Sequence, residues 1–316
     1  MTRIVRIGAR ASPLSMTQAR RIQARVAEAL RLEPGDQDHR VPLHPTITTG
    51  DKITDRRLIE AGGKGLFTKE LDEALLAGRI DLAVHSLKDL PTRLPAGIVL
   101  ACVPERADAR DALIARGAAT FADLPAGAVL GTASLRRQAQ ALHARPDLVV
   151  KTLRGNVETR LARIEEGAFD ATFLAVAGLQ RLGLEDRISS LVDPEAMPPA
   201  AGQGALAVTA RSADAEIRAM LEALDDRRAA IETGAERAFL AALDGSCRTP
   251  IAAWARLDDA GLSFLGETLT PDGKQRWRRS DRLPAGPDLA GAAAAMGDRL
   301  GRSIRAEAGD RLMRDG

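Results

Sequence analysis

Residues 4–13 read IVRIGARASP, and this stretch predicts a strand that passes directly into a helix. The apolar side chains of residues 4–9 are typical of a strand. Ser12 offers a hydroxyl that can cap the next helix, and Pro13 suits its first turn because proline has no backbone N–H to leave unsatisfied. We therefore predict a helix from here to about residue 31, with Arg10 at the junction.

The same handover from strand to helix recurs along the first two-thirds of the chain. Such alternation is typical of an α/β fold with a largely parallel sheet. In a first series we predict strands at residues 41–48, 81–85 and 98–103 and a helix at residues 66–76. In a second series, which begins near Ala112, we predict strands at residues 128–130, 148–152 and 171–175 and helices at residues 134–144, 157–166 and 177–182.

The later part of the chain predicts a division into three domains. Residues 194–204 are rich in proline, glycine and alanine, and the apolar run 205–210 is expected to return to the first domain as a strand. Beyond residue 226 a helix, three short strands and a final helix indicate a small α+β domain. The predicted domains are residues 1–104 with 205–222 (α/β), residues 110–199 (α/β), and residues 226–316 (α+β).

Composition indicates a globular cytoplasmic protein. The 316 residues are 45% hydrophobic and carry a net charge of only +2, so no global field attracts nucleic acid or a membrane surface. Aromatic residues make up 3%, with no tyrosine, which disfavours a nucleic-acid groove. No apolar run has the length of a membrane span, and the start of the chain lacks a signal-peptide core. The two cysteines fit a reducing compartment.

Basic residues cluster at the junctions where a predicted strand is followed by a predicted helix. In a parallel sheet these junctions share one edge, where ligands bind and where helix N-termini present free N–H groups. The pattern predicts a cleft for a ligand with many carboxylates or phosphates, held by guanidinium groups. For any single arginine, an ordinary surface ion pair is an equally good interpretation. The junction residues are Arg10, Lys64, Lys88, Arg136, Arg137, Arg154, Arg160 and Arg181.

Two other positions are candidates for chemistry. Asp89 follows the strand at residues 81–85, with Lys88 beside it, and its carboxylate could act as a general acid or base or stabilise a developing cation. On spacing alone a turn-capping aspartate is the better interpretation. Cys247 lies in a turn-rich loop beside Arg248, which favours a reactive thiolate, although on the local pattern alone an ordinary loop cysteine is the better interpretation. Cys102 is expected to be buried, and no residue set has the spacing of a metal site.

Together these segments resemble the porphobilinogen deaminase (hydroxymethylbilane synthase) family of tetrapyrrole biosynthesis. The resemblance runs in order from residue 3 to beyond residue 250. It is carried by RIGARASPL (6–14), GGKGLFTKEL (62–71), VHSLKD (84–89), GTASLRR (131–137), LRGNV (153–157), TRL (159–161), LAVAGL (174–179), GQGA (202–205) and GSC (245–247).

The resemblance implies two type II periplasmic-binding-protein-like α/β domains followed by a small C-terminal α+β domain. It also implies a dipyrromethane cofactor joined to Cys247 by a thioether. The implied enzyme is a transferase that deaminates four porphobilinogen molecules, condenses them head to tail on this primer and releases hydroxymethylbilane by hydrolysis. Each pyrrole carries two carboxylates, so the product chain is the polyanion that the arginines predict.

The resemblance also assigns roles to residues of this chain. Asp89 would be catalytic, contacting pyrrole N–H groups and stabilising positive charge. The implied cofactor-binding residues are Cys247, Ser86, Lys88, Thr132, Ser134, Arg136, Arg137, Arg154, Arg160 and Gln203. The implied substrate-binding residues are Arg10, Ser12, Lys64, Phe67, Arg154 and Arg181. No metal, nucleic acid or membrane partner is implied, and a monomer is expected.

Three positions depart from the family pattern. Glu60 stands where some bacterial relatives carry a lysine, Ala133 replaces a common serine, and Ser246 replaces a glycine before the cysteine. None of these changes removes the thiol, Asp89 or the principal arginines, so activity is expected to survive them.

Two other classes of function fit parts of the pattern. A non-catalytic binding protein or sensor would explain two lobes and a cleft, but it gives no reason for Cys247 or for a third domain. A nucleotide- or phosphate-transferring enzyme should show a true phosphate loop and a metal-binding carboxylate set, and GGKG at residues 62–65 lacks the required spacing.

Overall fold

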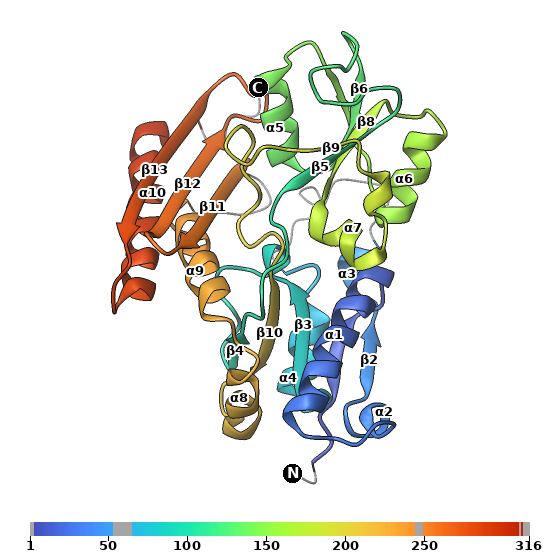
Figure 1. The fold of residues 1–316 in the computed structure, drawn as a ribbon, viewed down its shortest axis with the longest axis vertical. Coiled ribbons are helices and arrows are strands. Elements are labelled where there is room, and N and C mark those ends of the chain that lie inside the picture. Colours follow the sequence, from blue (N-terminus) through green and yellow to red (C-terminus); the bar gives the residue numbers. More distant parts are fainter. Residues whose placement is uncertain (1–2, 53–64, 244–248, 310, 312–316) are drawn as a thin grey trace. The chain divides into compact units, whose positions relative to one another are not determined.

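The computed structural model describes residues 3–52, 65–243, 249–309 and 311, which form three sheets (Figure 1). They divide into two compact units. The first unit contains Met1–Ile53, Gly63–Ala107 and Ala205–Ala230, and the second contains Thr54–Gly62, Asp108–Gly204 and Ile231–Gly316. The division into three domains at the predicted boundaries stays a prediction.

The first sheet has the strand order β2-β1-β3-β10-β4. β1 is parallel to β2 and β3, whereas β10 is antiparallel to β3 and β4. The prediction that residues 205–210 add a strand here is confirmed. Four of the five strands run in the same direction, as predicted for a largely parallel sheet, and β10 runs against them. The chain re-enters beside the carboxyl end of β3, where Leu206 pairs with Ser86, so β10 must run back against it. The strands are β1 (Ile7–Arg10), β2 (Leu43–Thr46), β3 (Leu82–Ser86), β4 (Ile98–Cys102) and β10 (Leu206–Arg211).

Helices cover both faces of this sheet. α1 (Pro13–Ala29) and α8 (Ala215–Glu222) pack on one face, and α4 (Lys69–Leu76) packs on the other. The alternation of side chains along β3 explains the two layers, since Leu82 and Val84 join the core under α1 while Ala83 joins the core under α4. α4 begins three residues later than predicted, because residues 65–68 form a turn.

The second sheet has the order β7-β6-β8-β5-β9, again with parallel strands followed by an antiparallel one. β5 was not predicted, and it runs antiparallel to β8. Its strands are β5 (Asp111–Ala115), β6 (Val129–Gly131), β7 (Val149–Lys151), β8 (Ala171–Ala175) and β9 (Ser190–Leu191). Buried residues place α5 (Leu135–Ala144) on one face and α6 (Val157–Glu165) and α7 (Val176–Leu182) on the other.

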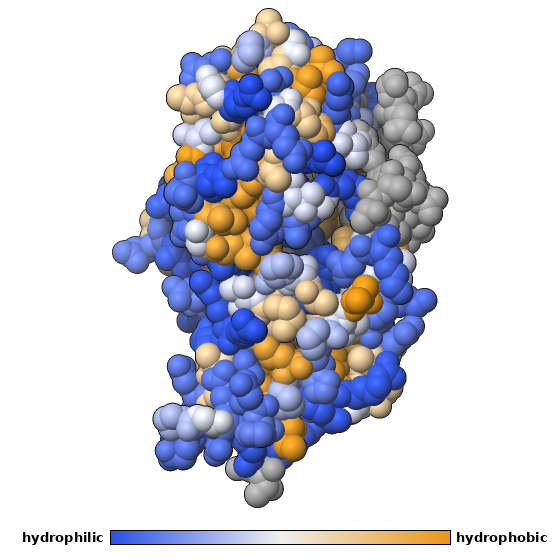
Figure 2. Space-filling view, turned by 90° about the vertical axis from the view of Figure 1, so that its right-hand side faces the viewer, coloured by the Kyte–Doolittle hydropathy of each residue, from blue (hydrophilic) through white to orange (hydrophobic). Residues whose placement is uncertain are grey.

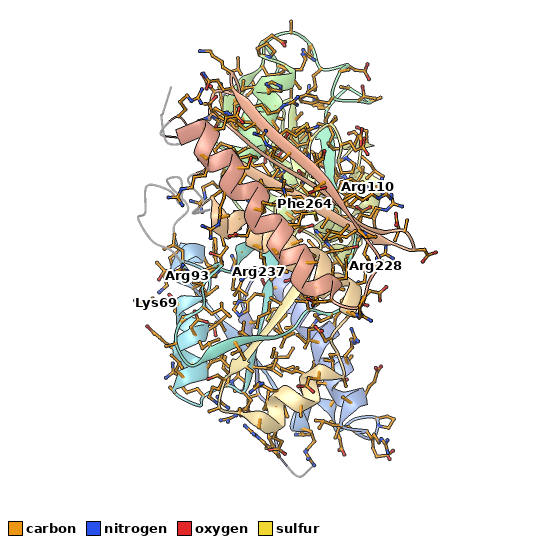
Figure 3. The ribbon with its side chains drawn as sticks, turned by 90° about the vertical axis from the view of Figure 1, so that its left-hand side faces the viewer. Lys69, Arg93, Arg110, Arg228, Arg237 and Phe264 are labelled. Carbon is orange, nitrogen blue, oxygen red and sulfur yellow. The ribbon has the colours of Figure 1, made fainter. Side chains whose placement is uncertain are left out.

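The third sheet is an antiparallel meander of β11 (Ile251–Asp258), β12 (Gly261–Leu269) and β13 (Arg276–Pro284). α10 (Leu289–Ala308) runs diagonally across it (Figure 3). α9 (Arg227–Ala242) contributes Phe239, whose ring lies 5.4 Å from that of Phe264 on β12. The predicted α/β and α+β classes are therefore both confirmed.

Short helices complete the described chain. They are α2 (Gln37–Arg40), α3 (Thr49–Lys52) and the 3-10 helices η1 (Leu87–Asp89) and η2 (Glu185–Arg187). The face in Figure 2 is mostly hydrophilic and is interrupted by small hydrophobic patches. Among the residues that the structure describes, no helix is both long and apolar enough to cross a bilayer.

Candidate functional site

A small pocket in the first unit lies where β1 and β3 end. These strands are parallel neighbours with Ala9 opposite Val84, so Arg10 and His85 follow at the same edge. This edge is the carboxyl end of the strands, where ligands bind in α/β sheets. The pocket is lined by Arg10, Ser15, Phe67, Thr68, Val84, His85, Ser86 and Asp89. It therefore brings together four of the predicted site residues: Arg10, Phe67, Ser86 and Asp89.

The guanidinium of Arg10 is held on two sides. It forms an ion pair with Asp51, whose Oδ1 accepts from Nε at 3.2 Å. Its carbon Cζ lies 4.1 Å from the centre of the Phe67 ring, in a cation–π contact. Burial acts to raise the pKa of Asp51, but hydrogen bonds from Arg10 and Thr48 outweigh it and lower that pKa. Arg10 is thus a fixed cation at the pocket.

Neighbouring polar residues are set by local structure. Ser12 caps α1, because its Oγ accepts from the backbone N–H of Ser15 at 3.4 Å. Ser86 Oγ accepts from Nε2 of the buried Gln18 at 3.1 Å. Lys88 is half-buried and Asp89 is exposed, both in η1. The carboxylate of Asp89 is therefore accessible at the pocket.

His85 lies in the wall of the same pocket but is fully buried. Burial, with a smaller contribution from the positive charge of Arg10, lowers its pKa to about 4. Its Nε2 is hydrogen-bonded to Thr209 Oγ1 at 3.2 Å. The imidazole is consequently neutral near neutral pH, which makes it a poor general acid there.

In the second unit, predicted residues gather at the start of α5. Ser134 caps this helix by accepting from the backbone N–H of Arg137 at 3.4 Å. Thr132 is buried, and its Oγ1 accepts from the backbone N–H of Ser134 at 3.1 Å. The first turn of α5 carries Arg136 and Arg137, as predicted. It thus combines free backbone N–H groups with two guanidinium groups, an arrangement suited to an anion.

Arg136 and Arg137 share one buried carboxylate. Nη2 of Arg137 donates to Asp111 Oδ1 at 2.7 Å, and Nη1 of Arg136 lies 2.8 Å from Asp111 Oδ2. Burial alone would raise the pKa of Asp111, but the charges of both arginines hold it well below its ordinary value. Neither arginine is an exposed surface cation, since both are buried in this network.

Gln203 joins the same network from another part of the chain. Its Nε2 donates to Asp111 Oδ1 at 2.9 Å and to the backbone carbonyl of Ala109 at 2.8 Å. Arg181 Nη2 donates to the backbone carbonyl of Gly204, next to Gln203, at 2.6 Å. Arg160 Nε donates to the carbonyl of Gly155 at 2.9 Å, and Arg154 is half-buried. Six of the predicted binding residues lie at the β6–α5 and β7–α6 junctions or in the helices that follow: Thr132, Ser134, Arg136, Arg137, Arg154 and Arg160.

Some predicted positions lie outside the described residues. These are Lys64 and Cys247, together with Glu60 and Ser246 among the departures from the family pattern. Ala133 is described and is half-buried ahead of α5.

The donors of α5 fit a ligand with carboxylate groups. Within the described part of the chain, the buried Nε atoms of Arg136 and Arg137 have no hydrogen-bond partner. Buried donors of this kind are normally satisfied, and a bound carboxylate is a suitable acceptor. The residues present are therefore compatible with a polycarboxylate cofactor.

Sequence reasoning missed Asp51, His85, Asp111 and Gln140. Asp51 and Asp111 are the partners of predicted arginines, and Gln140 Oε1 accepts from Arg136 Nη1 at 3.0 Å. For Asp111 the available signal was its position directly before the apolar run 112–115. For Gln140 it was the spacing of four from Arg136, which places both on one helix face.

Comparison with solved structures finds distant likenesses. A putative methionine-binding lipoprotein from Bacillus subtilis is 13% identical with a TM-score of 0.41, and the match covers 72% of this chain and 92% of that one. A nutrient binding protein from Burkholderia cenocepacia, bound to methionine, is 14% identical with a TM-score of 0.43, covering 69% and 90%. Likenesses this distant carry no conclusion about function.

Comparison with family models and curated proteins is far more specific. Residues 5–219 match the porphobilinogen deaminase, dipyromethane cofactor binding domain, and residues 230–305 match the porphobilinogen deaminase, C-terminal domain. The porphobilinogen deaminase of Phenylobacterium zucineum (strain HLK1) is 52% identical over 98% of both chains. That of Caulobacter vibrioides (strain NA1000 / CB15N) is 54% identical over 98% of this chain and 97% of its own. This chain therefore belongs to the porphobilinogen deaminase family.

Proposed function

We propose that Asp89 in the pocket of the first unit carries the chemistry of the family reaction, and that the arginines of the second unit hold pyrrole carboxylates. The activity itself is that of the family: a transferase, hydroxymethylbilane synthase, with porphobilinogen as substrate and dipyrromethane as cofactor. When bound, the cofactor supplies the pyrrole carbon to which porphobilinogen units are joined. A non-catalytic binding protein is not favoured, since both matching family models are deaminase domains.

The observation that carries the proposal is the composition of the pocket. Among its described lining residues Asp89 is the one carboxylate, and it is exposed there. A carboxylate in this position can accept a hydrogen bond from a pyrrole N–H and stabilise positive charge that develops as ammonia leaves. His85 is buried and is neutral near neutral pH, so it lines the pocket without carrying a charge, and Asp89 supplies the negative charge.

The pocket also offers a group for the substrate carboxylates. Arg10 is held by Asp51 and the Phe67 ring, and a guanidinium fixed in this way pays little entropy when it binds a carboxylate. We assign Arg10, Ser12, Lys64 and Phe67 to binding of porphobilinogen. In the second unit we assign Thr132, Ser134, Arg136, Arg137, Arg154, Arg160 and Gln203 to the cofactor, with Arg154 and Arg181 also assigned to the substrate.

Cys247 is the proposed site of covalent attachment, with Ser86 and Lys88 binding the cofactor near Asp89. The test compares the intact mass of the full chain with that of Cys247→Ala. We expect added mass equal to two linked pyrrole units on the native chain and none on the variant. A native chain without added mass, inactive with porphobilinogen, would contradict the attachment.

Asp89→Asn tests the chemistry separately, because the amide keeps the shape of the side chain and removes its charge. We expect an intact fold and loss of nearly all turnover, about a hundred-fold or more. Near-normal turnover would remove Asp89 from its role. The compartment and the monomeric state stay predictions.

A further inference from the structure

Asp111 contacts three of the side chains proposed to bind the cofactor. Its Oδ1 accepts from Arg137 Nη2 at 2.7 Å and from Gln203 Nε2 at 2.9 Å, and its Oδ2 lies 2.8 Å from Arg136 Nη1. These partners come from α5 and from the segment before β10, which are far apart in sequence. One carboxylate therefore ties together groups whose mutual geometry would decide how a carboxylate ligand is held.

Other contacts fix the remaining donors, so that the arginines have little freedom. Arg137 Nη1 donates to the backbone carbonyl of Phe173 at 2.7 Å. Arg136 Nη1 donates to the carbonyl of Pro198 at 3.1 Å and to Gln140 Oε1 at 3.0 Å. Because each guanidinium already donates to acceptors in the protein, it is held in one orientation. A fixed orientation is what a pre-organised anion site requires.

Within the trio of Asp111, Arg136 and Arg137 the charges do not cancel. Asp111 supplies one negative charge to two arginines, so the trio keeps a net charge of +1. The neighbouring cation Arg110 (Figure 3) adds nothing to this surplus, because it pairs with Asp108 at 2.6 Å.

The buried Glu267 accepts from Gln140 Nε2 at 2.8 Å, and its charge acts to raise the pKa of Arg136, but it is shared with the partly exposed Arg278. The two arginines therefore outnumber the one carboxylate that both of them contact, which is compatible with binding of an anion.

The position of Asp111 in the sheet matches such a role. β5 runs antiparallel to β8, with Asp111 opposite Ala175, the last residue of β8. Because of this reversal, the first residue of β5 lies at the carboxyl edge of the parallel strands, where ligands bind in α/β sheets.

We propose that Asp111 is a positioning residue for the cofactor site: it orients Arg136, Arg137 and Gln203 toward the carboxylates of the dipyrromethane. This inference rests on the proposed function, since it takes the cofactor-binding role of those residues as given. Asp111 itself is fully buried and acts through its partners.

The test is the fraction of purified full-length chain that carries the cofactor mass, measured for Asp111→Asn by intact-mass spectrometry. The matched control is Asp81→Asn, another fully buried carboxylate, which contacts Arg3, Arg6 and Arg211 in the first unit. Both variants are expressed and measured at a temperature where thermal unfolding shows them folded. We expect Asp111→Asn to lower the loaded fraction about ten-fold or more, the size seen when outer partners of metal ligands are removed. Asp81→Asn should load like the native chain.

Two further variants separate the possible failures. Arg137→Gln tests the proposed function directly and is expected to lose the cofactor. If Arg137→Gln is empty while Asp111→Asn is loaded and turns over normally, the positioning role is wrong and the proposed function stands. If Arg137→Gln is loaded normally, the arginine assignment itself fails. Should Asp111→Asn not fold, Asp111→Glu keeps the charge but moves the carboxylate by one methylene, and normal loading of that variant would overturn the positioning role.

Discussion

Asp81 and Asp111 are both fully buried carboxylates surrounded by arginines, yet they lie at opposite edges of two sheets with matching strand patterns. In each sheet three parallel strands are followed by an antiparallel one. Asp81 directly precedes the parallel strand β3, at the amino edge. Asp111 begins the antiparallel β5, at the carboxyl edge. The same chemical group is therefore placed away from the ligand-binding edge in one unit and on it in the other.

The two networks also differ in charge and exposure. The side chains of Arg3, Arg6 and Arg211 around Asp81 are 32%, 38% and 20% exposed. Asp81, Asp214 and Glu216 together supply three negative charges to these three arginines. That network is neutral and reaches water. Arg136 and Arg137 around Asp111 are only 6% and 7% exposed, and the next acid, the buried Glu267, contacts Gln140 and pairs with Arg278. We therefore expect both networks to stabilise the fold, and we propose that only the second also takes part in binding an anion.

The largest expected difference between the two networks is in the free energy of unfolding that is lost when each carboxylate is removed. Asp111→Leu leaves two buried guanidinium groups without a counter-charge, and we expect it to lower the free energy of unfolding by about 3–5 kcal/mol. Asp81→Leu should cost less, about 2 kcal/mol, because its arginines can reach water and because Arg3 and Arg211 still pair with Asp214. Urea denaturation followed by circular dichroism measures both. Equal losses would contradict the contrast in exposure.

Acid should weaken both networks by the same mechanism. The guanidinium partners outweigh burial and hold the pKa of Asp81 and of Asp111 below the ordinary value. A lowered pKa in the folded state gives stability above the ordinary pKa of about 4, and this stability is lost as pH falls further. In each Asp→Asn variant, the free energy of unfolding should therefore fall less steeply with decreasing pH, by up to about 1.4 kcal/mol per pH unit. Variants whose stability falls with acid as steeply as that of the native chain would show that these carboxylates do not titrate as argued.

The serine caps of α1 and α5 allow a further comparison of the two units, with smaller expected effects. Ser12 and Ser134 each accept a backbone hydrogen bond at 3.4 Å at the start of a helix. Replacing either by alanine should cost about 1 kcal/mol of unfolding free energy. The functional effects should differ: Ser134→Ala should lower cofactor loading, whereas Ser12→Ala should raise the KM for porphobilinogen, each by about five-fold. Identical effects on loading and KM would remove the distinction between the two units.

The caps and junctions were predictable because their signals are local. Ser12 before Pro13 and Ser134 before an apolar-periodic run each predict a helix start, and the structure has both. Arg10, Arg136 and Arg137 follow from these junctions, since each lies within a few residues of a cap. The prediction of an apolar strand at residues 205–210 was right for the same reason.

The partners of those arginines could not be predicted in the same way. Asp111 begins a five-residue strand whose apolar run does not reveal its direction or its neighbour, and β5 was missed altogether. Its contact with Gln203 spans 92 positions, and that of Arg10 with Asp51 spans 41. Sequence spacing carries no information about such pairs, because tertiary packing decides which carboxylate meets which guanidinium. The reversed direction of β10 and of β5 could not be predicted for the same reason.

The smallest expected effect comes from Arg6→Ala, which removes the most exposed of the three arginines that contact Asp81. Arg6 donates two side-chain hydrogen bonds to Asp81, but Arg3 and Arg211 remain within 2.9 Å of that carboxylate. A partly exposed pair of this kind contributes about 0.2–1 kcal/mol, and the loss should fall in that range, with cofactor loading and turnover unchanged. Urea denaturation and intact mass measure the two quantities on one preparation. A loss above about 3 kcal/mol would mean that Asp81 depends on Arg6 as a buried ion pair does. Lowered loading would mean that the amino edge of the first sheet influences the cofactor site, and the division between a structural and a binding carboxylate would then fail.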